Sequence, residues 1–132
     1  MMHIEAFRDY CLSKPMVEES FPFDRSTLVF KVYGKMFALT NLDNPTFEVN
    51  LKCDPERAIS LREQYNEVKP GYHMNKKHWN TIEFEGRIRQ KELIEMIDHS
   101  YNLVVSKLLV SQQKTLSEFI TNQIDNETKD NL

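Results

Sequence analysis

The chain has 132 residues, of which 40% are hydrophobic and 28% are charged, and this composition predicts one globular domain with a single core. No apolar run approaches the roughly 18 residues that a membrane-spanning helix needs, which excludes such a helix and a membrane partner. The net charge of −3 argues against a protein whose whole surface binds phosphates. The first residues lack the apolar segment of a signal peptide, so we expect a cytoplasmic protein.

The first half of the chain begins with a helical pattern and continues with strand patterns. Ile4 and Phe7 start an apolar repeat that predicts a short amphipathic helix ending before Pro15. Alternation and β-branched content then predict four strands. These are an edge strand over 17–23, a hairpin of 27–33 and 36–42 with its turn at Gly34-Lys35, and a strand over 47–52.

The second half is mostly helical. Asp54 and Pro55 are typical of a helix N-terminus, and the apolar stripe that follows ends near Asn66. The remaining predictions, in chain order, are a connection over 69–78, a strand over 79–85, a long core helix from 90 to about 110, a short helical turn around 116–120 and a loose polar tail over 121–132.

Together these elements predict an α+β fold in the order α-β-β-β-β-α-β-α. The short turns make the strands antiparallel, and the polar face of the fourth strand places the helices on the other face. We therefore expect a two-layer sandwich with an antiparallel sheet of about five strands and helices on one face. Residues 1–112 form the predicted domain, and residues 113–132 form a polar C-terminal extension that is partly helical or disordered.

Residues 70–81 hold the only tryptophan, two of the four histidines, two adjacent lysines and a Pro-Gly turn signal. They also lie in a basic segment, because residues 69–91 carry six Lys or Arg against two Glu, a net charge of +4. Aromatic side chains interleaved with cations are used by surfaces that bind single-stranded nucleic acids. Stabilisation of a loop by the same side chains is the alternative reading.

The sequence lacks the motifs of several well-known catalytic and metal sites. We find no glycine-rich phosphate loop and no serine-hydrolase or zinc-protease motif, so we predict no enzyme activity, no catalytic residues and no cofactor. His73 and His78 are five residues apart without an intervening ligand, which does not match a metal site. Cys11 and Cys53 match no metal or redox spacing and are predicted to be reduced thiols.

Four stretches, residues 70–81, 27–39, 50–56 and 100–105, closely resemble the MmcQ/YjbR family of small bacterial proteins, and together they cover roughly residues 4–110. The resemblance implies a CyaY-like α+β fold, shared with frataxin-type proteins, and a DNA-binding role. It does not carry iron binding across, because Glu5 and Asp9 alone do not form the acidic ridge that such a site needs.

Our leading hypothesis is a non-enzymatic binding module with DNA as its partner. The candidate site residues are Lys69, Tyr72, His73, Lys76, Lys77, His78, Trp79, Asn80, Arg87 and Arg89. The first alternative is a small-molecule or protein-interaction module with a pocket around Trp79. The second is a purely structural role for residues 70–81, which a buried Trp79 without an adjacent cleft would favour. We expect a monomer.

Overall fold

The computed structural model describes residues 1–130, with the side chains of residues 1–123. Its elements in chain order are α1 (Ile4–Ser13), β1 (Val17–Ser20), β2 (Thr27–Val32), β3 (Lys35–Asn41), β4 (Glu48–Lys52), α2 (Pro55–Gln64), β5 (Val68–Pro70), β6 (Trp79–Glu83), α3 (Gln90–Val105) and α4 (Val110–Asp130). This arrangement confirms the predicted α+β class. Helix α2 starts as expected, with the Asp54 carboxylate accepting from the Arg57 amide at 3.3 Å and Pro55 in the first turn.

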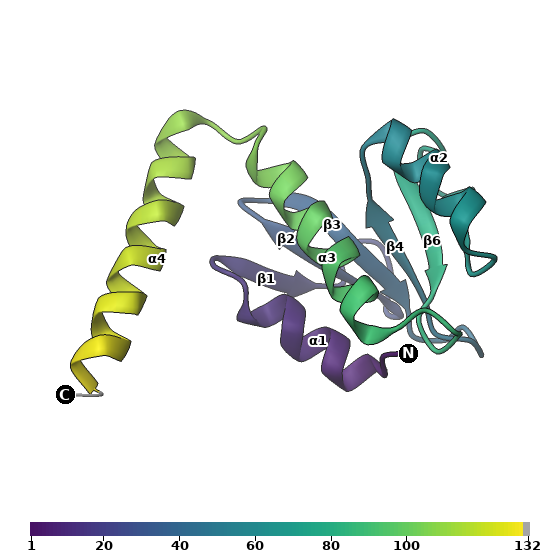
Figure 1. Cartoon of the computed structure of the whole chain (residues 1–132), viewed down its shortest axis with the longest axis horizontal. Coiled ribbons are helices and arrows are strands. Elements are labelled where there is room, and N and C mark those ends of the chain that lie inside the picture. Colours follow the sequence, from purple (N-terminus) through teal and green to yellow (C-terminus); the bar gives the residue numbers. More distant parts are fainter. Residues whose placement is uncertain (131–132) are drawn as a thin grey trace.

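The strands form one antiparallel sheet in the order β1-β2-β3-β4-β6-β5. Side chains alternate between the two faces along each strand, so the register assigns every residue to a face. Val49 lies opposite Ile82 on the face that packs against α1, α2 and α3 (Figure 1), whereas Asn50 lies opposite Thr81 on the other face. We call this second face the open face. The helices therefore pack on one face, as predicted.

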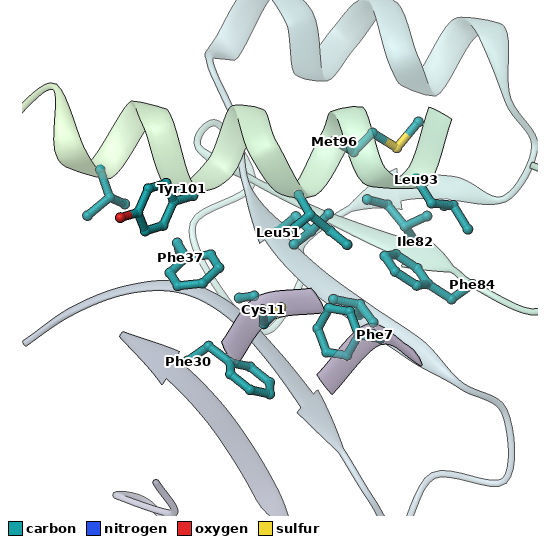
Figure 2. Close-up of a cluster of buried hydrophobic side chains, with 14 of the residues drawn as sticks. Phe7, Cys11, Phe30, Phe37, Leu51, Ile82, Phe84, Leu93, Met96 and Tyr101 are labelled. Carbon is teal, nitrogen blue, oxygen red and sulfur yellow. The ribbon is translucent and has the colours of Figure 1, made fainter. Parts of the chain in front are cut away.

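The main core lies between the helices and the sheet (Figure 2). Phe7 of α1 is fully buried, and its ring makes edge-to-face contacts with Phe30, Phe47 and Phe84 at centroid distances of 5.4, 5.6 and 5.3 Å. Each such aromatic pair contributes about 0.5–1.5 kcal/mol beyond its area burial. Helix α3 covers the same core with a buried stripe that includes Leu93, Met96, Ile97, Tyr101 and Val104.

The connection expected over residues 69–78 begins with a strand, so the sheet has six strands rather than about five. Val68 of β5 lies opposite Ile82, and Pro70 lies opposite Asn80. Three residues are too short for an alternation pattern, and proline argues against an interior strand. Pro70 is tolerated because β5 is at the edge of the sheet, where its missing amide leaves no interior hydrogen bond unmade.

Other element ends also differ from the predictions. Strand β1 ends at Ser20, and the hairpin turn lies at Tyr33-Gly34, where both residues have positive φ (49° and 75°) as a tight hairpin turn requires. Helix α3 ends at Val105, and α4, which leads away from the sheet (Figure 1), replaces the short helical turn and the loose segment expected before residue 131. The last two residues of the predicted tail lie outside the described residues.

Helix α4 begins where Gln112 accepts a hydrogen bond from the Leu109 amide at 3.2 Å. Leu116 is buried in the core and anchors the helix there. The predicted domain boundary near residue 112 falls in its first turn. In the described part of the chain, no helix is both long enough and apolar enough to cross a membrane.

Candidate functional site

Residues 71–78 form a loop that folds back against the start of β6. The Gly71 amide donates to the Trp79 carbonyl at 2.9 Å, and the Met74 amide donates to the Gly71 carbonyl at the same distance. A Cβ at position 71 would lie 2.9 Å from the Trp79 Cβ and 3.0 Å from its carbonyl oxygen. Glycine is therefore needed here because the two backbone segments approach too closely for a side chain.

Arg62 of α2 fastens this loop to the sheet. Its Nε donates to Asn80 Oδ1 at 2.7 Å, and its Nη2 donates to the Lys76 carbonyl. Asn80 is 1% exposed, and its Nδ2 donates to the Ala58 carbonyl at 3.3 Å, so both ends of its amide are satisfied. Arg62 was not among the predicted site residues, and no local pattern distinguishes it from Arg57, the other arginine of α2.

Trp79 is buried in a small apolar cluster. It is 6% exposed and packs on the open face with Val29 and Leu39, and Met36 and Met74 cover the edge of this cluster. His78 is half-buried, and its carbonyl accepts from the Cys53 amide at 2.8 Å, which joins the loop to the end of β4. These contacts support the structural reading for Trp79, Asn80 and the backbone of His78.

The exposed aromatic ring of the loop belongs to Tyr72. Its side chain is 63% exposed, and Lys76 Nζ lies 4.9 Å from the ring centroid. This distance allows a cation–π contact. Asn75 shapes the turn between them by accepting from the Lys77 amide at 2.9 Å. Tyr72, rather than Trp79, is the ring available to a planar ligand.

A cavity of about 200 Å³ lies beside Tyr72 on the open face. Its lining comes from β4, β5, β6 and the connections that flank β5, and comprises Glu48, Asn66, Glu67, Lys69, Pro70, Tyr72, His73, Thr81 and Glu83. Three of the ten candidate residues, Lys69, Tyr72 and His73, thus line one cavity. Trp79 and Asn80, which the small-molecule alternative placed in a pocket, do not line it.

The basic segment 69–91 does not form one patch, because β6 separates its two halves. Lys76 and Lys77 precede this five-residue strand, and Arg87 and Arg89 follow it. A strand of that length spans about 16 Å. Arg89 is also engaged in an ion pair with Glu92 in the first turn of α3. Lys76 and Lys77 therefore lie at the opposite end of β6 from Arg87 and Arg89.

The structure instead gathers lysines from several elements at one end of the sheet. We call this group, formed by Lys35, Lys52, Lys76, Lys77 and Lys107, the basic end. Lys35 starts β3, Lys52 ends β4 opposite Trp79, Lys76 and Lys77 precede β6, and Lys107 follows α3. Within residues 1–123, no ion pair involves any of the five.

Lys52 lies within range of the charges of Lys35 and Lys107. Partial burial is the largest influence and lowers its pKa, and the nearby positive charges of Lys107 and Lys35 lower it further. The nearby carboxylate of Asp54 caps α2 by accepting from the Arg57 amide. The basic end is thus a local positive surface on a chain whose net charge is −3.

The thiols and histidines offer no metal centre among the described residues, where no group of three or more His, Cys, Asp or Glu could hold an ion. Cys11 and Cys53 are buried free thiols. Burial raises the pKa of Cys53 to about 11 and also raises the pKa of Cys11, so both remain protonated near neutral pH.

Comparison with known proteins identifies the family. The YjbR family model matches residues 12–103. The chain is 38% identical over 110 residues to the uncharacterized protein YbdF of Escherichia coli O157:H7, covering 83% of this chain and 90% of that protein. It is 33% identical over 115 residues to the uncharacterized protein YjbR of E. coli K12, covering 87% and 98% of the two chains.

Solved structures share the fold. A crystal structure of a Deinococcus radiodurans protein with the domain DUF419 superposes with a TM-score of 0.82 at 39% identity and covers 89% of each chain. A Pseudomonas syringae protein superposes with a TM-score of 0.68 at 30% identity, covering 77% of this chain and 98% of that chain. On the family match, the sequence identity and the shared fold, this chain belongs to the YjbR family.

Proposed function

We propose that this chain is a non-enzymatic DNA-binding protein and that the basic end contacts the phosphates. The observation that carries the proposal is the placement of Lys35, Lys52, Lys76, Lys77 and Lys107 at one end of the sheet. Burial and then the charges of Lys107 and Lys35 lower the pKa of Lys52, which agrees with this placement. Like charges held together repel one another, and a phosphate backbone relieves that repulsion while releasing its own counterions.

The loop over residues 71–78 supports the same surface in two ways. Arg62 holds the Lys76 carbonyl, and the backbone of His78 is joined to Cys53 beside Lys52. These contacts fix the backbone on which Lys76 and Lys77 are carried. The buried residues of the 70–81 stretch therefore act as scaffold, and its exposed lysines are available to a ligand.

The test is fluorescence anisotropy with labelled DNA over a range of salt concentrations. We expect binding to weaken as salt rises, because each phosphate contact contributes roughly −0.9 to the slope of log K against log salt on duplex DNA. A double substitution, Lys76→Ala with Lys77→Ala, should weaken binding several-fold and reduce the slope by about 2.

The matched control is Arg87→Ala with Lys91→Ala, which removes two exposed cations beyond the other end of β6. It should leave affinity nearly unchanged if the basic end is the contact surface. Equal loss in both double variants would refute the assignment of the site. No salt-dependent binding at about 100 μM protein, the weak end of non-specific DNA affinity, would refute DNA binding altogether.

A further inference from the structure

The cavity on the open face and the basic end meet at Tyr72. Tyr72 is one of the lining residues of the cavity, and the Lys76 ammonium lies 4.9 Å from its ring centroid. Lys76 belongs to the basic end, and Lys69 extends positive charge to the cavity lining itself. A ligand that crosses from the lysines into the cavity must therefore pass over an exposed aromatic ring.

The lining decides which part of such a ligand enters. Glu48 and Glu83 lie directly opposite each other on β4 and β6, and Glu67 completes the acidic side of the cavity. Three carboxylates repel a phosphate, so the backbone of a nucleic acid stays outside, on the lysines. The carboxylates and the Asn66 side chain instead accept hydrogen bonds from the N–H groups of an uncharged base.

We propose that this site takes single-stranded DNA, with one unpaired base stacked on Tyr72 and inserted into the cavity. The proposal rests on the proposed function and specifies its substrate class. Bases in a duplex are paired and stacked, and they cannot enter a side pocket without being extruded. Single-strand surfaces combine a cationic track with aromatic platforms on which bases stack, and this is the arrangement around Tyr72.

The proposal is tested by anisotropy with three labelled ligands of equal length. These are a single strand of mixed sequence, its duplex, and the same single strand with abasic positions replacing its central bases. We expect the single strand to bind more tightly than either of the others. Tyr72→Ala should weaken single-strand binding about 5- to 150-fold, the range found when a stacking aromatic residue is removed, and should weaken duplex binding far less.

Phe23→Ala is the matched control. Phe23 is also 63% exposed, but it lies in the β1–β2 connection at the opposite end of β2 from Lys35. Its substitution should leave both affinities unchanged. Equal effects of the Tyr72 and Phe23 variants would overturn the assignment of Tyr72 as the stacking platform.

Two further outcomes separate this proposal from the one on which it rests. Salt-dependent binding that is equal for duplex, single strand and abasic strand, and unaffected by Tyr72→Ala, would overturn the single-strand proposal while leaving DNA binding in place. Displacement of the labelled strand by deoxyguanosine monophosphate or deoxycytidine monophosphate at the strand's own concentration would assign the cavity to free nucleotides instead of a strand. Absence of binding to every DNA ligand would refute both.

Discussion

Replacing Arg62 with alanine should destabilise the domain strongly for a change of a partly exposed charge. The substitution removes the donor to Asn80 Oδ1 at 2.7 Å and the donor to the Lys76 carbonyl. Hydrogen bonds that involve a charged group contribute about 1.5–3 kcal/mol each, and the buried Asn80 oxygen would lose its partner. Because Arg62 itself is only half-buried, we discount this sum and expect a loss of about 2–4 kcal/mol.

Urea unfolding followed by tryptophan fluorescence measures this loss directly, since Trp79 is the only tryptophan and lies beside the affected contacts. Arg62→Lys is the informative companion, because one ammonium cannot reproduce the planar fork that reaches two acceptors. It should recover less than half of the lost free energy of unfolding.

A double-mutant cycle with Asn80→Ala tests whether the two side chains act together. We expect a coupling energy of at least about 1 kcal/mol, within the range for side chains in direct hydrogen-bonded contact. If the free energy of unfolding of Arg62→Ala lies within about 0.5 kcal/mol of the parent value, the size of a typical surface substitution, Arg62 does not hold the loop against the sheet. Full rescue by lysine would likewise show that charge alone, and not the fork geometry, matters.

Two further changes test other contacts of the fold. The Asp54 amide donates to His99 Nε2 at 3.1 Å, and burial, followed by the positive charge of Arg57, lowers the pKa of His99 below 6.5. The folded state therefore binds a proton at His99 more weakly than the unfolded state does, so urea midpoints should fall as pH drops below about 6.5. His99→Gln should flatten this pH dependence. If the dependence of the midpoint on pH is the same in the variant, His99 does not cause it. Gly71→Ala should cost about 1–3 kcal/mol by overpacking, because its Cβ would lie 3.0 Å from the Trp79 carbonyl oxygen. Gly86→Ala should cost less, because the only close contact of its Cβ is with the flexible Glu67 side chain and the Glu83 carbonyl oxygen lies at an ordinary 3.5 Å. Equal unfolding midpoints for the two variants would show that the contact at position 71 relaxes freely.

Residues 70–81, one of the stretches that resemble the family, contain two kinds of residues with different roles. Gly71, Trp79 and Asn80 are buried and hold the loop against the sheet. Tyr72 and Lys76 are exposed and are free to meet a ligand. In the sequence these residues are interleaved and equally conspicuous, so their density indicated an important stretch without separating scaffold from surface. A substitution study of residues 70–81 should therefore measure stability and binding on every variant.

Local patterns were sufficient for most of the fold. The Asp54-Pro55 start of α2, the alternation of β4 and the stripe of α3 each depend on residues within a few positions of one another, and their predictions are confirmed. Strand β5 was missed because three residues ending in proline acquire strand geometry only by pairing with β6. Its existence depends on a tertiary contact.

The candidate site depended on tertiary structure to a greater degree. Sequence alone drew attention to the loop over residues 71–78, because its aromatic residues, lysines and glycine are local features. The sequence analysis also assigned Lys76 and Arg87 to one surface because they are near each other in the chain. In the structure, β6 separates the two residues. Antiparallel pairing of β3, β4 and β6 instead places Lys76 at the same end of the sheet as Lys35 and Lys52. The fold also brings Arg62 of α2 to Asn80 of β6. Strand order and register decide which side chains distant in sequence become neighbours. For this protein they assemble the basic end from lysines of several elements instead of from one basic segment.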